Sequence, residues 1–493
     1  MSRPRARFAQ RHAQAITCGV LAAALLGGLL WLAALLWPVA LPGSIPARLQ
    51  CVSYEPFRLP GESPLRKHAR ISRARIDRDL AVLAQHFDCV RTYSVSQGLD
   101  QVPALAARHG MQVLLGIWIG PDARANAREI AHAIVVARNA PAGSIRAIVV
   151  GNEVLLRGDQ PASVLLRDLH EVRAATGLPV TYADVPAFWL RHPELAPAVN
   201  FISVNMLPYW DNKPVSARAA VTRVARQMRR VQAAFPGKPV FISETGWPSA
   251  GRARRDAVPS RVNEALYLRG FIAWAQAHGQ RYNLIEAFDQ PWKRALEGTV
   301  GGSWGIYDSW AHPKFAWSGP VTEDPRAWWA LLPLLLGAVI GAWRGGGSAR
   351  ICGALAGAGT GLALWALWRM AQAAAWNIAQ WTYWVRSAPG CCSAHGCCWM
   401  LCARCCAVLG SHIPSAWRRW PSPRCLPWCT WTCCWCSMAA IATGRCRRSS
   451  PSRWVWRYCA SCTAHRCCMA HAHARWHWRH CCWAWWACCR KRC

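Results

Sequence analysis

The chain has 493 residues, of which 53% are hydrophobic, so it is long and apolar enough for two or three domains with large buried cores. Its formal net charge of +34 at pH 7 is typical of nucleic-acid-binding proteins. However, residues 1–49 contain five Arg and the residues after Asp324 contain 20 Lys or Arg, without any acid, whereas the middle of the chain is only mildly basic. This distribution disfavours a nucleic-acid partner.

The N-terminus has the pattern of a membrane anchor. Residues 1–14 form a basic segment, and residues 15–41 are uncharged and exceed the roughly 20 apolar residues that cross a bilayer. A removed signal peptide is the alternative, but the run is longer than a signal-peptide core and offers only a faint cleavage pattern, Ala-Leu-Pro-Gly. Because basic flanks stay in the cytoplasm, we expect a bacterial inner-membrane protein whose following domain lies on the periplasmic or extracellular side.

Residues 50–318 alternate short β-rich runs with longer stretches of helical period. The helical stretches include residues 76–84, 123–139, 162–176, 215–234 and 262–278, and the eight β-rich runs are residues 51–57, 89–94, 112–119, 147–153, 180–185, 201–209, 240–246 and 284–288. Eight such units in this length predict an α/β fold, a (β/α)8 TIM barrel, which typically needs about 250 residues. A doubly wound open sheet is the alternative, but residues 55–60 contain no glycine-rich phosphate loop.

Residues 327–385 predict two or three transmembrane helices. Residues 327–343 and 351–368 are uncharged, and the short basic loop between them would lie in the cytoplasm if the barrel lies outside. Residues 371–385 are a less clear third span, because they include Asn377 and Gln380.

The composition changes abruptly in residues 388–493, which hold 22 of the 26 Cys and no Asp, Glu, Asn, Gln or Phe. Zinc-ligand spacings occur there, but Cys at about a fifth of positions produces them by chance, and the turn residues of a disulfide scaffold are missing. Leucine codons CTG become cysteine codons TGC when read one base late. We therefore hypothesise a frameshift near residue 387 and assign this tail no function; resequencing the gene tests the hypothesis.

Two carboxylates are the candidate catalytic groups. Glu153 ends the fourth predicted strand and Glu244 ends the seventh. The C-terminal ends of barrel strands form the catalytic face, and strands four and seven lie across its mouth from each other. A single strand-end Glu usually hydrogen-bonds a neighbouring loop, but two at this face favour catalysis.

The motifs around these residues resemble a known family. Gly151–Val154 and Glu244–Ser249 are similar to the two signatures of glycoside hydrolase family 17, the β-1,3-glucanase family, and the resemblance extends to Leu207–Trp210 and Glu286–Lys293. It is closest to bacterial membrane-anchored members linked to β-glucan synthesis or remodelling.

This resemblance implies that Glu153 is the general acid and base and Glu244 the nucleophile of a retaining glycosidase, which needs no metal or cofactor. Retaining hydrolysis requires one protonated and one ionised carboxyl about 5–5.5 Å apart. We expect β-1,3-glucan as substrate, and the lipid bilayer and other glucan-biosynthesis proteins as further partners. A β-glucan transglycosylase, which branches or cyclises glucan, and a non-catalytic glucan-binding module remain as alternatives.

Other residues are expected to bind substrate: Asn152, Tyr209, Trp247, Lys293, Tyr93, Asn205, Trp118 and Asp289. Asn152 resembles the residue that hydrogen-bonds the sugar 2-hydroxyl, a contact that strengthens in the transition state. Tyr209 is predicted to orient Glu244, with a solvated rim tyrosine as the alternative. Trp118 and Trp247, like Trp292 and Trp304, are expected to stack on sugar faces or to pack the barrel rim.

Three further positions carry open predictions. Lys293 resembles a lysine of plant members whose acidic partner is replaced here by Gln290, so that Asp289 or Glu286 is expected to compensate. Arg91 and Tyr93 share one side of a strand and are either site-lining residues or core fillers. Cys51 and Cys89 begin adjacent strands, but the sequence leaves open whether they form a disulfide.

Overall fold

A computed structural model describes residues 3–42, 45–66, 68–375 and 378–385. The Cys-rich tail, for which we hypothesised a frameshift, lies outside the described residues.

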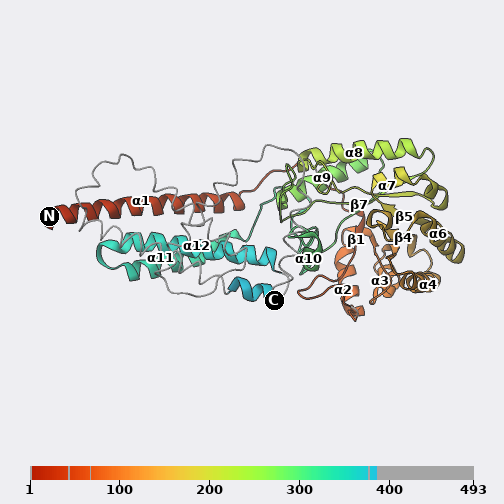
Figure 1. Cartoon of the computed structure of the whole chain (residues 1–493), viewed down its shortest axis with the longest axis horizontal. Coiled ribbons are helices and arrows are strands. Elements are labelled where there is room, and N and C mark those ends of the chain that lie inside the picture. Colours follow the sequence, from red (N-terminus) through yellow and green to blue (C-terminus); the bar gives the residue numbers. More distant parts are fainter. Residues whose placement is uncertain (1–2, 43–44, 67, 376–377, 386–493) are drawn as a thin grey trace, which may run out of the picture. The chain divides into compact units, whose positions relative to one another are not determined.

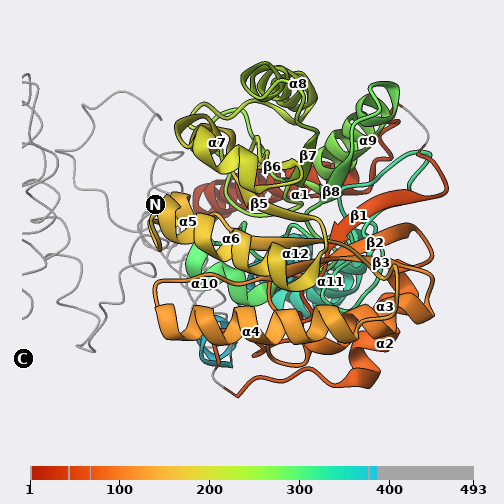
Figure 2. The same cartoon turned by 90° about the vertical axis from the view of Figure 1, so that its right-hand side faces the viewer.

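The centre of the described chain is a closed barrel of eight parallel strands that follow one another in chain order (Figure 2). The barrel closes between the first and last strands, where Cys51 pairs with Asn283 and Val52 with Leu284. The predicted barrel is confirmed, and the open doubly wound sheet is wrong. The strands are β1 (Leu49–Ser53), β2 (Phe87–Arg91), β3 (Gln112–Ile117), β4 (Ile145–Asn152), β5 (Val180–Asp184), β6 (Ile202–Asn205), β7 (Val240–Thr245) and β8 (Tyr282–Leu284).

Helices surround these strands (Figure 2). The bounds predicted for α4 and α6 are those observed, and Asp122 caps α4 by accepting hydrogen bonds from two backbone amides of its first turn. Several elements of four to seven residues, α3, α5, α7 and α10, are too short for a periodic pattern and were not predicted. The helices are α2 (Arg73–Leu83), α3 (Val102–Arg108), α4 (Ala123–Asn139), α5 (Val154–Arg157), α6 (Ala162–Thr176), α7 (Pro186–Arg191), α8 (Ala217–Ala234), α9 (Arg261–Ala277) and α10 (Arg294–Glu297).

The last strand differs from the prediction. It covers Tyr282–Leu284, whereas residues 284–288 were expected. The apolar residues after Leu284 bond mainly to another loop: the Glu286 amide donates to the Trp304 carbonyl, and the Tyr307 amide donates to the Ala287 carbonyl. This pairing with a later segment gives no local signal in the sequence.

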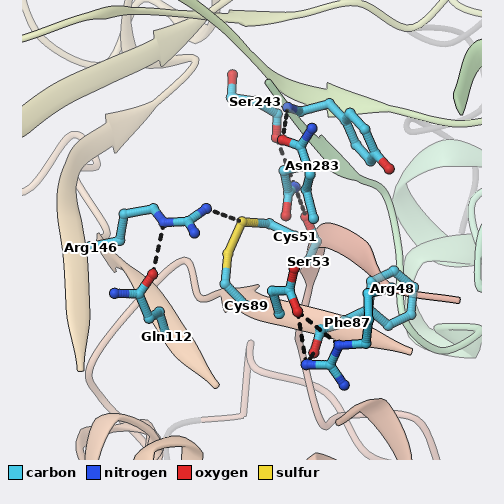
Figure 3. The surroundings of a disulfide bond; sticks show 12 residues. Arg48, Cys51, Ser53, Phe87, Cys89, Gln112, Arg146, Ser243 and Asn283 are labelled. Carbon is cyan, nitrogen blue, oxygen red and sulfur yellow. Dashed lines mark hydrogen bonds and ion pairs between the residues drawn. A yellow bond between two sulfur atoms is a disulfide. The ribbon is translucent and has the colours of Figure 1, made fainter. Parts of the chain in front are cut away.

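A disulfide joins the first two strands at their middle residues. Cys51 and Cys89 face each other in the register of β1 and β2, with a Cα–Cα distance of 4.5 Å, and both are fully buried (Figure 3). Arg146 lies beside the bond, with Nη1 3.6 Å from the Cys51 sulfur. The structure thus answers the question that the sequence left open.

Replacing Cys51 and Cys89 together by serine should lower the free energy of unfolding by about 2–4 kcal/mol, because the disulfide restricts the unfolded chain. Denaturant unfolding of the full chain in detergent, followed by tryptophan fluorescence, measures the effect. Both proteins carry Cys18→Ser and Cys352→Ser, because the disulfide between α1 and α12 closes a loop that contains the barrel. The matched control is this background protein after reduction with dithiothreitol, which should unfold like the variant that also lacks Cys51 and Cys89. Equal barrel stability with and without Cys51 and Cys89 would contradict the prediction.

In the described part of the chain, three helices are long and apolar enough to cross a membrane: residues 12–36 of α1 (Arg3–Leu36), residues 327–345, which include α11 (Leu331–Gly345), and α12 (Arg350–Ala374). The predicted first span ends earlier than expected, because Pro38 disfavours helix in the residue before it. The less clear third C-terminal span is not found as one long helix in the described residues, where residues 378–385 form a short helical stretch.

Helices α11 and α12 pack through glycines and lie side by side (Figure 1). A Cβ added to Gly341 would lie 2.0 Å from the Gly353 carbonyl oxygen, and one added to Gly357 would lie 1.9 Å from the Gly337 oxygen. Glycines spaced four apart allow such close backbone approach in membrane helices. The sequence pattern of these residues therefore specifies a tight helical hairpin.

Candidate active site

A cavity of about 1070 Å³ opens at the C-terminal ends of the strands. Seven of the ten residues predicted for the site line it: Tyr93, Trp118, Asn152, Glu153, Asn205, Glu244 and Lys293. Tyr209, Trp247 and Asp289 do not belong to its lining. Both candidate catalytic carboxylates therefore face one space.

Glu244, near the end of β7, accepts hydrogen bonds from two side chains at the end of β2 and just after it. Arg91 Nη1 lies 3.0 Å from Glu244 Oε1, and the Tyr93 hydroxyl donates to the same oxygen at 2.8 Å. Arg91 is only 1% exposed and also donates to the Ser243 carbonyl oxygen. Among the described residues Oε2 has no hydrogen-bond donor, so this oxygen is left for a substrate in the cavity.

Glu153 follows β4 directly and lies partly buried in the cavity wall. Burial and the nearby Glu244 charge raise the pKa of Glu153 to about 7, although the hydrogen bond from Asn205 Nδ2, at 2.8 Å, opposes the shift. A carboxyl with this pKa carries its proton over much of the range up to neutral pH. The two carboxyls thus differ in their surroundings, as an acid and a nucleophile must.

One polar network connects the two carboxyls. Asn152 Oδ1 accepts hydrogen bonds from Arg91 Nη2 at 2.8 Å and from Asn205 Nδ2 at 3.1 Å. Ser243 in turn donates to Asn205 Oδ1 at 2.7 Å. Because the oxygen of Asn152 is occupied, its amide nitrogen is the group available to a sugar hydroxyl.

The sequence left open whether Arg91 lines the site or fills the core. The structure places it in the site. It contacts Glu244, Asn152 and the face of the Tyr93 ring, 4.5 Å from the ring centroid. The signal in the sequence was a charged residue within an apolar strand, because a buried Arg requires several acceptors.

Three predicted contacts are corrected. The Tyr209 hydroxyl donates to the Arg252 carbonyl oxygen at 2.5 Å rather than to Glu244, because β6 ends at Asn205 and Tyr209 lies in the loop beyond it. Trp247 is fully buried, so its ring does not meet a sugar. Asp289 is half-buried and pairs with Lys314, with an oxygen–nitrogen distance of 3.0 Å.

The expected partner of Lys293 is identified. Its Nζ lies 2.7 Å from Glu286 Oε2 and 3.6 Å from Glu55, so Glu286 takes the place left by Gln290. Burial alone would lower the pKa of Lys293, but the Glu286 and Glu55 carboxylates outweigh it and hold that pKa well above its usual value. Lys293 is therefore a fixed positive charge in the cavity wall. Glu55 was not predicted.

Aromatic rings line the cavity as well. Trp118 is 44% exposed and carries the Arg157 guanidinium over its ring at 4.5 Å. Trp210 and Trp304 are nearly parallel, with centroids 6.3 Å apart. Amphipathic rings at a cavity wall suit sugars, which have apolar faces and polar edges. Among the described residues, no group of three or more His, Cys, Asp and Glu has the arrangement of a metal site.

Replacing Tyr93 by phenylalanine should lower kcat/KM by about 10- to 100-fold, because a hydrogen bond to a charged group contributes about 1.5–3 kcal/mol. The matched control is Tyr209→Phe, since that hydroxyl bonds the Arg252 carbonyl instead of a cavity residue. Steady-state kinetics on laminari-oligosaccharides compare the two variants. A larger loss for Tyr209→Phe would restore the role first predicted for Tyr209.

Comparison with known proteins finds a matching family and several relatives. The model of the BtgE/BtgC glycoside hydrolase domain matches residues 51–305. A probable β-glucosidase btgE from Aspergillus fumigatus is 28% identical over 236 residues, which are 46% of this chain and 41% of the relative. The glucan 1,3-β-glucosidase BGL2 of Candida albicans is 30% identical over 254 residues, 47% of this chain and 82% of the relative. The chain thus spans about two-fifths of the Aspergillus relative.

Solved structures are similar to the barrel region. The glycoside hydrolase family 17 β-1,3-glucanosyltransferase from Rhizomucor miehei is 26% identical, with a TM-score of 0.48, and the match covers 54% of this chain and 97% of that chain. An active-site mutant of the Rhizomucor miehei β-1,3-glucanosyltransferase in complex with laminaritriose is 25% identical with the same TM-score, and covers 56% and 98%.

Proposed function

This chain belongs to the BtgE/BtgC glycoside hydrolase family, and on that premise we propose that it cleaves β-1,3-linked glucan with retention of configuration. Glu244 is the nucleophile and Glu153 the general acid and base. The observation that carries the proposal is one cavity with two carboxyls in unlike surroundings: Glu244 bonded to Arg91 and Tyr93, and Glu153 with a pKa raised to about 7.

In the first step, Glu244 Oε2 attacks the anomeric carbon while Glu153 gives its proton to the departing glycosidic oxygen. The bond to the leaving sugar breaks as the bond to Glu244 forms. Arg91 and Tyr93 hold Glu244 Oε1 during the attack, and the Asn152 amide donates to the sugar 2-hydroxyl. This last contact supports the transition state more than the ground state.

In the second step, the ionised Glu153 takes a proton from an incoming hydroxyl, which attacks the anomeric carbon and releases Glu244. The first and second steps each invert the carbon, so the product keeps the β configuration. Water as the incoming group gives hydrolysis, and a sugar hydroxyl gives transfer to a longer glucan.

Transfer is the second candidate. The cavity lining includes Leu156, Phe188 and Leu190, which follow β4 and β5, and these side chains would hold an acceptor sugar. Incubating the protein with laminari-oligosaccharides tests both candidates. Products longer than the substrate mean transfer, only shorter products mean hydrolysis, and no products with retained glucan binding would support a non-catalytic module.

We expect kcat/KM to fall as the pH rises through about 7, because Glu153 must be protonated to assist the leaving group. Because the pKa of this carboxyl is raised, its proton is present below about pH 7 and is lost above it. Activity should therefore be high below this pH and fall above it. A pH series on laminari-oligosaccharides measures the alkaline limb. On the same oligosaccharides, the residual activity of the Glu153→Gln variant should lack that limb, and persistence of the limb would assign it to another group.

We also propose that the chain is anchored in a membrane, with residues 50–318 as the glycosidase domain outside the cytoplasm. Three helices long and apolar enough to cross a bilayer support this placement, as do the N-terminal arginines. A bacterial inner membrane and further glucan-biosynthesis partners remain part of this proposal.

A further inference from the structure

The segment that carries Glu153 is fastened by three consecutive residues of β5. The Glu153 amide donates to the Ala183 carbonyl oxygen at 2.7 Å. The Leu155 amide donates to the Tyr182 hydroxyl at 3.0 Å, and the Leu156 amide lies 3.4 Å from Asp184 Oδ2. The backbone on both sides of the Glu153 side chain is therefore tied to the neighbouring strand.

This segment needs such support. Glu153 has a left-handed backbone conformation with φ at +54°, which residues other than glycine adopt only when their surroundings impose it. The helix that follows, α5, has only four residues and is too short to be stable alone. Contacts from outside the segment must therefore set the direction of the Glu153 side chain.

Asp184 and Tyr182 are well placed to supply these contacts. They are 0% and 1% exposed, respectively, and the Tyr182 hydroxyl donates to Asp184 Oδ2. The Val185 amide donates to the other oxygen, Oδ1, at 2.7 Å. Neither residue lines the cavity, although Val185 does, so they do not touch a substrate there.

We propose that Asp184 and Tyr182 are positioning residues for the general acid: they hold residues 153–156 so that the Glu153 carboxyl faces the glycosidic oxygen. This inference rests on the proposed role of Glu153. It adds two buried residues of β5 that act on the reaction only through that side chain.

The charges around Glu153 give the direction of the effect. Burial raises the pKa of Glu153 most, and the Glu244 charge on β7 and the Asp184 charge on β5 add to it. The hydrogen bond from Asn205 on β6 and the Arg157 charge on α5 lower it. Asp184→Asn removes one of the two negative charges. The pKa of Glu153 then falls, and the alkaline limb of the activity moves to lower pH.

The test compares Asp184→Asn and Tyr182→Phe in the full-length protein. Each variant should lower kcat on laminari-oligosaccharides by about 10- to 100-fold, the range expected when a catalytic group is misplaced by about 1 Å. With 2,4-dinitrophenyl β-glucoside, each variant should change the rate of the first step by less than about threefold, because that leaving group needs no proton. The release of dinitrophenolate measures this rate. In addition, Asp184→Asn should shift the alkaline limb to lower pH.

The matched control is Thr181→Val, which removes a buried hydroxyl from the same strand. Thr181 donates to the Phe201 carbonyl oxygen at 2.7 Å, and in the described part of the chain its side chain has no hydrogen bond to residues 153–156. This variant should leave the alkaline limb and the leaving-group dependence unchanged, even if its melting temperature falls. Tyr182→Phe, which removes a single hydroxyl, keeps the test valid should Asp184→Asn fail to fold.

Two kinds of failure are distinguishable. If Tyr182→Phe and Asp184→Asn lose activity equally on both substrates, or if the alkaline limb of Asp184→Asn stays in place, the positioning role is wrong. If the wild-type protein has no alkaline limb, or if its limb persists in Glu153→Gln, the proposed role of Glu153 is wrong.

Discussion

Replacing Glu244 by glutamine should lower kcat/KM on laminari-oligosaccharides by about 10⁴-fold or more, as expected when a nucleophile is removed. The amide has nearly the same shape, and its oxygen still accepts from Arg91 and Tyr93, so the cavity keeps its form. It lacks the carboxylate oxygen that would attack the anomeric carbon. Glucan affinity, measured by calorimetry, should therefore change by less than about tenfold, or 1.4 kcal/mol.

Glu297→Gln is the matched control for this loss, because Glu297 also lines the cavity but lies beyond the carboxyl pair, on α10. It should reduce kcat/KM by no more than about tenfold. A Glu244→Gln protein with wild-type kcat would refute the assignment of the nucleophile. Loss of glucan binding together with activity would instead mean that Glu244 holds the site together.

The sequence was sufficient for the barrel because its signals are local. Apolar runs marked the strands, and the bounds of α4 and α6 followed from helical periodicity between clear breaks, such as the Asp122 cap and the left-handed Gly177. Strand ends then placed Glu153 and Glu244 at one face, because all strands of a parallel barrel end on the same side.

The contacts within the site were harder to predict because they join residues far apart in the chain. Arg91 reaches Glu244 and Asn152, which lie on β7 and at the end of β4. No local pattern distinguishes this use of a buried Arg from a packing role. Tyr209 is the opposite case, because a site contact was predicted for it and is not found. The strand before it is four residues long and ends too early to bring its hydroxyl to Glu244.

The general acid has a different expected signature from the nucleophile. Glu153→Ala should lower kcat/KM on laminari-oligosaccharides by about 10²- to 10⁴-fold, because a sugar leaving group needs a proton. On 2,4-dinitrophenyl β-glucoside the first step should proceed almost normally, since dinitrophenolate leaves without one. The second step should then become slow, because no base activates water, and a burst of dinitrophenolate followed by slow turnover should appear in stopped-flow measurements.

Azide distinguishes this role from that of Glu244, because it is a nucleophile that needs no base. Added to Glu153→Ala, it should enter the space left by the side chain, accelerate turnover and give the β-glucosyl azide. A β product requires two inversions and hence a covalent bond to Glu244 in between. Added to Glu244→Ala, azide should attack directly and give the α-glucosyl azide. An α product from both variants would mean that no glycosyl-enzyme forms, and that the two carboxyls act as the acid and base of an inverting enzyme instead.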